Sequence, residues 1–371
     1  MDASFLNSFK DPALVTELLG VIDRLSGRLY ERLGRPVNLM EVCGTHTVAI
    51  ARSGFRSVLP ASLRLVSGPG CPVCVTANSD IDRIIALTRV PQVIVATFGD
   101  MVRVPGSSTS LMQCKAKGAA VEVIYSPLDA LALAQSHPDK QVVLVGVGFE
   151  TTTPLIAATV LRAQALGLDN FSVIAAHKRV PPALKALVDD PQIALDALIL
   201  PGHVSTILGV EPYVFLARDH HIPGVITGFE PVDVLQGIAQ LLRQLVEERS
   251  EIEISYMRGV MSEGNPTALA TIDKVFDVCD ADWRGMGSIP GSGYAIRQEF
   301  AAFDALRRFE LEVEPTVEPK GCRCGDVLRG VLAPSQCPLF GKACTPTNPI
   351  GPCMVSSEGS CAAWFRYQIK D

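Results

Sequence analysis

The feature that most constrains the fold is a repeated alternation of short apolar runs with segments long enough to form helices. One series of runs covers residues 37–42, 63–67, 92–97 and 121–125, and a second covers residues 142–147, 171–176, 197–200 and 224–227. Nearly continuous Val, Ile and Leu runs are typical of strands buried on both faces. Parallel neighbours need long crossover connections, which the intervening segments can supply. The sequence therefore predicts an α/β fold of doubly wound, Rossmann-like parallel sheets.

The two series also predict how the chain divides. We expect an N-terminal helix within residues 1–34, a first α/β domain over residues 35–126 and a second over residues 127–250, with a seam near 126–138. Residues 251–371 form a C-terminal region that partly returns to the α/β domains, with a further strand at 252–258 and a Gly-rich loop at 283–293. Residues 320–371 hold six of the eleven cysteines. We expect a small iron–sulfur domain there, at about 312–371.

Composition and charge narrow the range of partners. The chain has 371 residues, 19% of them charged, and a net charge of −6, so it has no excess of basic residues to bind nucleic acid. No apolar run approaches the roughly 20 residues that span a bilayer, and the first residues lack the layout of a signal peptide. We therefore expect a cytoplasmic protein. Eleven cysteines in such a chain indicate metal or redox chemistry rather than a disulfide framework.

Cysteines follow the first two predicted strands. Cys43 comes after the first, and Cys71 and Cys74 come after the second. If these strands are parallel neighbours, all three thiols emerge at the edge where open α/β sheets bind ligands. The start of a helix should lower the pKa of Cys43 and favour the thiolate, which is a nucleophile and a soft-metal ligand. His46 can lie on the same side of that first helical turn; the alternative is that both residues are only structural.

Three further residues or motifs are candidates for the same edge. Cys71-Pro-Val-Cys74 is typical of a redox dithiol at a helix start. A zinc half-site is the main alternative, although no second C-x-x-C is present to complete it, and two buried free cysteines are the structural alternative. Glu150 and His203 follow later predicted strands. Glu150 could instead serve only to stabilise a helix dipole.

The C-terminal cysteines form a second group. A four-iron cluster needs four thiolates, so two of the six would remain. Zinc is the competing metal, but a C-x-C followed by wide spacings fits no zinc-finger pattern well. The sequence thus favours iron–sulfur chemistry for the set Cys322, Cys324, Cys337, Cys344, Cys353 and Cys361.

Taken together, these motifs resemble the hydrogenase maturation family HypD. The matching stretches are residues 43–47, 68–74, 148–152 and 201–205, and the cysteine-rich run 322–359. The resemblance implies a role in assembling the Fe(CN)2(CO) group of [NiFe]-hydrogenase, as a redox-active scaffold rather than a turnover enzyme. It further implies that iron is held between this chain and HypC, and that cyanide arrives from HypE as a thiocyanate.

The resemblance also implies roles for single residues. Cys43 would bind the iron with His46 beside it, and Cys71 and Cys74 would exchange electrons; Glu150 and His203 complete this expected catalytic set. A [4Fe-4S] cluster would be held by Cys322, Cys337, Cys344 and Cys361. Cys324 and Cys353 would then be a second redox pair, although the choice between Cys322 and Cys324 as ligand stays open.

Two other functions fit part of the pattern. An iron–sulfur thiol–disulfide oxidoreductase would use the dithiol and the cluster but would leave Cys43 and His46 without a role. A non-catalytic iron-binding scaffold would use the sulfur atoms only as ligands.

Overall fold

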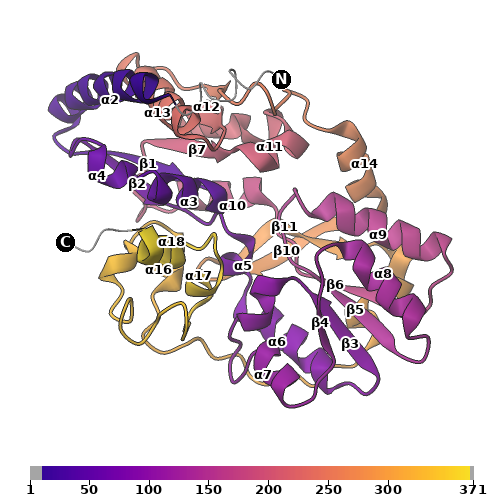
Figure 1. Ribbon diagram of the computed structural model, residues 1–371. Coiled ribbons are helices and arrows are strands. Elements are labelled where there is room, and N and C mark those ends of the chain that lie inside the picture. The colour runs from indigo at the N-terminus through magenta and orange to yellow at the C-terminus, as the bar shows by residue number, and fades with distance from the viewer. Residues whose placement is uncertain (1–10, 368–371) are drawn as a thin grey trace.

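The alternation of strands and helices is confirmed by a computed structural model, which describes residues 11–367 (Figure 1). Every predicted strand is present, with ends that differ by at most a few residues. The strands are β1 (Val37–Glu41), β2 (Leu63–Ser67), β3 (Val93–Thr97), β4 (Val121–Val123), β5 (Gln141–Gly146), β6 (Phe171–Ala175), β7 (Ala197–Pro201), β8 (Gly224–Thr227), β9 (Ile252–Ile254), β10 (Phe276–Trp283) and β11 (Gly287–Ile296).

Helices connect most of these strands. The α-helices are α2 (Pro12–Leu33), α3 (Gly44–Arg52), α4 (Phe55–Val58), α5 (Pro72–Val75), α6 (Asn78–Ala86), α7 (Leu111–Ala116), α8 (Pro127–Ser136), α9 (Thr153–Ala165), α10 (Val180–Val188), α11 (Gly202–Leu208), α12 (Val214–His220), α13 (Pro231–Val246), α14 (Pro266–Val275), α15 (Ala305–Arg308), α16 (Cys324–Leu328), α17 (Pro352–Val355) and α18 (Ser360–Tyr367). Short 3-10 turns cover Leu87–Arg89, Gly99–Arg103, Glu211–Tyr213, Gln298–Phe303 and Pro334–Gln336.

The expected N-terminal helix is α2, and the part of that prediction over residues 1–10 lies outside the described residues. Asp11 begins the helix by accepting a hydrogen bond from the Ala13 N–H, and Gly34 ends it with a φ of 68°, a conformation that glycine adopts at little cost. α2 packs against α13 on one face of the first sheet (Figure 1).

The strands are shared between the sheets differently from the expected division. One parallel sheet has the order β2-β1-β7-β8-β9 and the other has the order β4-β3-β5-β6. The expected boundary at residues 126 and 127 is therefore corrected, because β3 pairs with β5 across it and β1 pairs with β7. The limit at residue 250 is not a boundary either, since β8 pairs with β9. Apolar runs of similar composition do not specify which strand pairs with which.

The expected Gly-rich loop is mostly an antiparallel hairpin. β10 and β11 pair along most of their length, and only residues 284–286 connect them. The chain then returns to the four-stranded sheet, where Asp304 bridges to Val173 on β6. The last part of the chain carries α16, α17 and α18. It packs beside α3 and α5, below the five-stranded sheet and to the left of the four-stranded sheet in Figure 1. The cysteine-rich region is thus placed against both sulfur motifs of the first sheet.

Candidate thiol and metal site

Cys43 and the dithiol motif lie at the same edge of the five-stranded sheet, as predicted. β1 and β2 are parallel neighbours in register, so the segments that follow them leave the sheet side by side. The Gly44 N–H donates to the Gly70 carbonyl over 2.8 Å. A Cβ atom on Gly70 would lie 2.4 Å from the Cα of Cys43, so only glycine permits this contact.

A pocket of about 320 Å³ opens at this edge, between β1 and β7. Here the strand order reverses direction, which is where open α/β sheets bind ligands. Its walls come from both sheets and from the cysteine-rich region, and include Cys43, Pro72, Phe149, Thr151, His203 and Glu358. Three distant parts of the chain therefore meet around Cys43.

The thiol of Cys43 is buried, and this reverses the predicted direction of its pKa. Burial raises the pKa to about 12, and the nearby Glu358 carboxylate adds to the rise. The N–H groups of His46 and Thr45 at the start of α3 act in the opposite direction but are outweighed. The Thr45 hydroxyl donates to Glu358 over 2.8 Å, which fixes the carboxylate beside the thiol. The helix start was predictable, but the chain that covers it was not.

His46 is a neutral, buried imidazole. Burial lowers its pKa to about 4. Its Nε2 lies 2.9 Å from the Gly228 carbonyl, which can only accept, so Nε2 carries the proton and Nδ1 is left as an acceptor. Nδ1 is buried and has no hydrogen-bond partner within the described residues. Phe229 stacks between His46 and His203, at 4.6 and 4.0 Å between ring centroids.

Two buried carboxyl groups lie near this edge. Burial raises the pKa of Glu41 to about 7; it accepts from the Thr47 hydroxyl over 2.7 Å. Burial likewise raises the pKa of Glu150 to about 7; its Oε1 accepts from the Val180 N–H over 2.9 Å, and its Oε2 is buried without a hydrogen-bond partner among residues 11–367. The residues on either side of Glu150 line the pocket, so Glu150 itself lies behind the wall. Glu41 was not predicted.

Cys71 and Cys74 form a disulfide across α5. Cys71 is the N-cap of this short helix, and its sulfur accepts from the Cys74 N–H over 3.2 Å. Both residues are buried in the same apolar core as several C-terminal cysteines. α5 packs against α17, which carries Cys353. The dithiol therefore lies between the Cys43 pocket and the cysteine-rich region.

The six C-terminal cysteines line one small pocket with Leu339 and Phe340. The sulfur atoms of Cys324 and Cys353 lie 2.8 Å apart, and each has a further thiol neighbour, Cys322 beside Cys324 and Cys361 beside Cys353. No three His, Cys, Asp or Glu side chains in residues 11–367 are arranged to hold a single metal ion. Four thiols around a shared apolar pocket could hold an iron–sulfur cluster, because both two-iron and four-iron clusters take four thiolates. The residues outside the close pair are Cys322, Cys337, Cys344 and Cys361.

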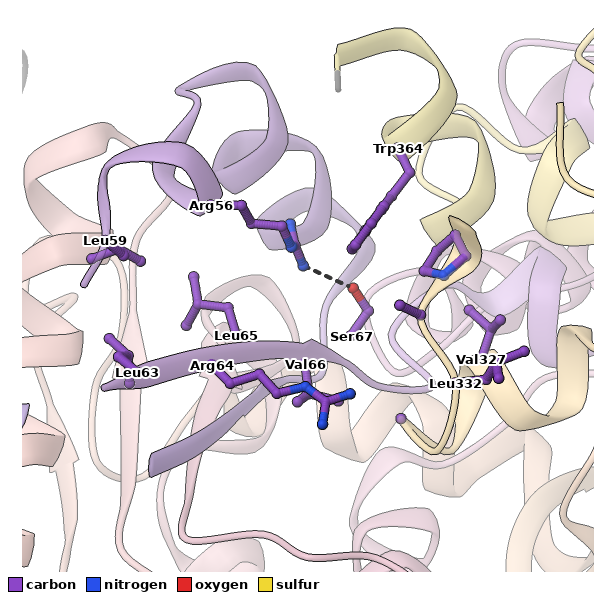
Figure 2. Close-up of a pocket in the computed structure, with 13 residues that line it drawn as sticks. Arg56, Leu59, Leu63, Arg64, Leu65, Val66, Ser67, Val327, Leu332 and Trp364 are labelled. Carbon is purple, nitrogen blue, oxygen red and sulfur yellow. Dashed lines mark hydrogen bonds between the residues drawn. The ribbon is translucent and has the colours of Figure 1, made fainter. Parts of the chain in front are cut away.

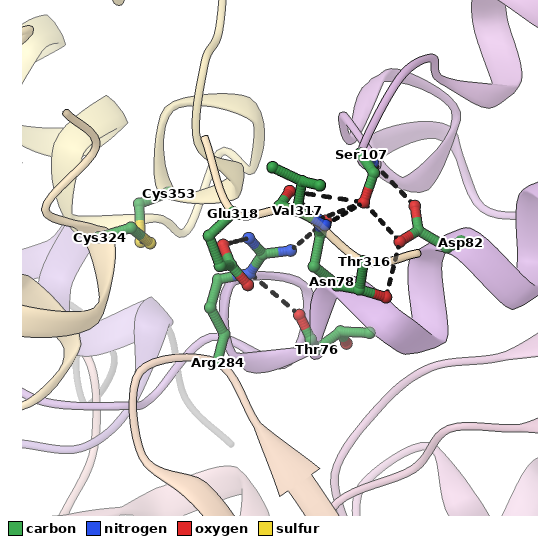
Figure 3. Close-up of polar contacts among 10 residues, drawn as sticks. All are labelled: Thr76, Asn78, Asp82, Ser107, Arg284, Thr316, Val317, Glu318, Cys324 and Cys353. Atoms are coloured by element: carbon green, nitrogen blue, oxygen red, sulfur yellow. Dashed lines mark hydrogen bonds and ion pairs between the residues drawn. The ribbon is translucent and has the colours of Figure 1, made fainter. Parts of the chain in front are cut away.

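A buried guanidinium connects the dithiol helix to the cysteine-rich region (Figure 3). Arg284, in the turn between β10 and β11, donates to the Thr76 carbonyl and to Asn78 Oδ1, each over 3.1 Å. It also pairs with Glu318 at 2.9 Å, just before the cysteines begin. Hydrogen bonds from neighbouring thiols, together with this positive charge, lower the pKa of Cys324. Since residue 284 falls in the predicted loop, nothing in the sequence marked it.

Two parallel sheets with a thiol, a C-x-x-C and a group of six cysteines around one edge define an α/β protein with a cysteine-rich site. The HypD family model, described as "Hydrogenase formation hypA family", matches residues 15–368. The chain therefore belongs to the HypD family. In the part of the chain that the structure describes, no helix is long and apolar enough to cross a membrane.

Relatives are similar along nearly their whole length. The hydrogenase expression/formation protein HupD of Azotobacter chroococcum mcd 1 is 46% identical over 98% of this chain and 96% of its own. The hydrogenase maturation factor HypD of Rhodobacter capsulatus is 45% identical over 98% of both chains. The HypD of Escherichia coli (strain K12) is 42% identical over 99% of both.

Proposed function

We propose that this chain is a hydrogenase maturation factor that holds iron while its cyanide and carbonyl ligands are added, in the cytoplasm and together with HypC and HypE. Family membership supports the coarse role. The observation that carries the finer role is the convergence of Cys43, the Cys71–Cys74 motif and the cysteine-rich region on one pocket.

The iron is the cargo of this reaction, and Cys43 is its ligand on this chain. A thiolate suits low-valent iron because sulfur is a soft ligand. Binding would displace the thiol proton, as metal binding to cysteine does in general. The pocket beside Cys43 leaves room for a partner to supply a second ligand, which we assign to a HypC cysteine.

Cyanide delivery requires two electrons, which the dithiol would supply. A thiolate of the Cys71–Cys74 pair attacks the sulfur of a partner thiocyanate, R–S–C≡N, and cyanide leaves. The second thiol then displaces R–S⁻ from the mixed disulfide. In total, one dithiol and one R–S–C≡N give one disulfide, one R–SH and one HCN. The step would leave Cys71 and Cys74 joined as a disulfide, and the disulfide between these two residues supports the proposal.

The oxidised dithiol must be reduced again, and we assign this step to the cysteine-rich region. A [4Fe-4S] cluster, when bound by Cys322, Cys337, Cys344 and Cys361, would supply electrons one at a time. Cys324 and Cys353 would form the second redox pair, supported by their 2.8 Å sulfur contact. The packing of α17 on α5 supports a short route from this pair to the dithiol.

The remaining site residues would shape the pocket. His46 and Phe229 lie behind Cys43, and the exposed His203 forms the outer wall. Because burial lowers the pKa of both imidazoles, they would be neutral near pH 7 and would not compete with iron for cyanide as cations. Glu150 would hold the start of α10 through its bond to the Val180 N–H.

Infrared spectroscopy tests the iron role directly. Purified with HypC, the chain should show the absorption bands of iron-bound cyanide and carbonyl, and the Cys43→Ala variant should lose them. Cys279→Ala is the matched control, because Cys279 lies on β10 away from this pocket and should keep the bands. Bands that persist in Cys43→Ala would show that another group holds the iron.

A thiol–disulfide oxidoreductase is the second candidate, favoured by the Cys71–Cys74 disulfide alone. It predicts no cyanide or carbonyl bands in any preparation. A scaffold without redox chemistry predicts that titration of free thiols finds no change at Cys71 and Cys74 during cyanide transfer.

A further inference from the structure

We propose that a groove along β2 binds an extended segment of a partner protein, which adds to the five-stranded sheet as a further strand and places an acidic side chain against Arg56 and Trp364. The groove lies along β2 (Figure 2). None of its lining residues lines the pocket at Cys43. Three independent features carry this inference: an open strand edge, unpartnered buried donors, and an apolar lining whose only charged groups are arginines.

β2 is the edge strand of its sheet, and no strand in residues 11–367 pairs with it on the outer side. The Val37 N–H on β1 donates to the carbonyl of Ser62, just before β2. Alternate residues of a parallel strand bond to the same neighbour, so the even-numbered residues of β2 face β1. The backbone groups of Leu65 and Ser67 therefore face outward. Such an edge is a template for an added strand.

Unpartnered donors lie above this edge. The Arg56 guanidinium gives one hydrogen bond, from Nη2 to the Ser67 hydroxyl over 3.2 Å, as the dashed line in Figure 2 marks. Its Nε and Nη1 are buried and have no hydrogen-bond partner within the described residues, and the same holds for Nε1 of Trp364. The guanidinium lies 5.2 Å from the centre of the Trp364 ring. Buried donors without partners are costly, and a carboxylate would satisfy them.

The lining of the groove suits the side chains of an added strand. It is a cavity of about 220 Å³ between β2 and residues 327–334, with Leu63, Leu65 and Leu332 among its walls. Its charged lining residues are Arg56 and Arg64, so a segment with alternating apolar residues and one Asp or Glu is complementary. Alternate side chains of an added strand would point into the groove and give specificity.

Glu41 is the group that could make Arg56 merely structural, since it lies close enough to favour the charged guanidinium. Glu41 does not satisfy the Arg56 donors, because the carboxylate and the guanidinium each bond to the Ser67 hydroxyl and not to one another. Nε and Nη1 of Arg56 therefore stay without a hydrogen-bond partner among the described residues. Position supports a binding role as well. β2 runs directly into the Gly68–Cys71 turn, and the opposite wall follows Cys324, so a bound segment would lie beside both thiol motifs.

A peptide library displayed on phage tests this proposal on the full chain, purified without oxygen. Selection on the native protein, with subtraction on the Arg56→Gln variant, should enrich peptides that alternate apolar residues and contain an Asp or Glu. Enriched peptides should bind Arg56→Gln at least about tenfold more weakly, the loss expected of one charge-assisted hydrogen bond. Arg64→Gln is the matched control on the same groove and should cost less than about threefold, because Arg64 is exposed.

The contrary outcomes are distinct. No enrichment, peptides without an acid, or a helical spacing of apolar residues would each overturn the proposal. Because Arg56→Gln could unfold locally, Trp364→Phe serves as a second variant that keeps an aromatic ring beside the guanidinium and removes the N–H donor. The Trp364→Phe variant should bind an enriched acidic peptide severalfold more weakly, while the thermal unfolding of the variant is unchanged. Hydrogen exchange should show the bound peptide protecting residues 63–67. The readout is binding, so it stands apart from any test of hydrogenase maturation.

Discussion

The two parallel sheets have the same connection pattern and different chemistry at their edges. In each, the first strand lies inside the sheet, the second lies at the outer edge beside it, and later strands add on the other side. At the carboxyl edge of the five-stranded sheet lie Cys43, the dithiol and His203. At the same edge of the four-stranded sheet, His177 is buried with no hydrogen-bond partner in the described residues, next to a Lys178–Asp80 pair at 2.9 Å.

The two sheets share one topology but carry different side chains at their carboxyl edges. The topology therefore determines where a site can form, and the side chains determine which chemistry the site can perform. The four-stranded sheet contributes walls instead of sulfur: Phe149 and Thr151, from the segment after β5, line the pocket over Cys43. The cysteine-rich region closes the pocket from a third side through Glu358. The account therefore assigns thiol chemistry to one sheet edge and packing to the other, and the following variants test that assignment.

The largest effect is expected for Cys71→Ser. This variant should lose hydrogenase maturation by on the order of 100-fold or more, because a single remaining thiol cannot store two electrons. Its brown cluster absorption should be unchanged, since Cys71 is outside the proposed ligand set. Cys279→Ser, on the side of the four-stranded sheet, should mature hydrogenase normally. Full activity in Cys71→Ser would contradict the dithiol step.

Two glycine variants compare one turn at the carboxyl edge of each sheet. A Cβ on Gly70, after β2, would lie 2.2 Å from the backbone nitrogen of Cys43, whereas a Cβ on Gly99, after β3, would meet nothing within 4 Å. Gly70→Ala should destabilise the chain by about 1–3 kcal/mol and impair maturation at least tenfold. Gly99→Ala should change stability by less than about 0.5 kcal/mol. Thermal unfolding measures both changes in stability. Equal destabilisation by the two variants would contradict the claim that only the turn after β2 is closely packed.

A smaller, pH-dependent effect is expected for Glu150→Gln. Burial raises the folded pKa of Glu150 from 4.5 to about 7, so the folded state holds this proton more tightly than the unfolded state. Its contribution to stability is therefore present below about pH 4.5 and is lost as pH rises through 7. A glutamine side chain cannot ionise, so the variant does not lose stability in this way. Between pH 5 and pH 8 its free energy of unfolding should rise by about 1–3 kcal/mol relative to that of the native chain. Unfolding curves at both pH values measure the gain.

The exposed carboxyl group of Glu122 on β4 gives the control for this measurement. Glu122→Gln should leave the pH profile of stability unchanged to within about 0.5 kcal/mol. A Glu150→Gln profile that parallels the native one would show that this carboxyl group is not held protonated by burial.

The sequence predicted the parts of this molecule that depend on local patterns. Runs of Val and Ile marked the strands, and the cysteines that follow two of them were correctly expected side by side. The pairing of β3 with β5 and of β1 with β7 was missed, because the amino-acid composition of a strand does not specify which strand it pairs with. The raised pKa of Cys43 was missed for a related reason, since burial by residues around Glu358 depends on contacts over 300 positions away.

Residues that act through tertiary contacts were also beyond prediction. Phe229 contacts His46 and His203 only because the fold brings the end of β8 beside both imidazoles. Arg284 lies in a turn, and its three partners come from two distant segments. Arg56 is an ordinary helical residue until Trp364 covers it.

The most direct test of the account follows the two thiols during cyanide release. The reduced chain is mixed with its thiocyanate-carrying partner, free and iron-bound cyanide is quantified, and Cys71 and Cys74 are probed by alkylation and mass spectrometry. We expect one new Cys71–Cys74 disulfide for each cyanide released. The Cys43 thiol should not be oxidised in this reaction. Cyanide released while both thiols remain free for alkylation would contradict it.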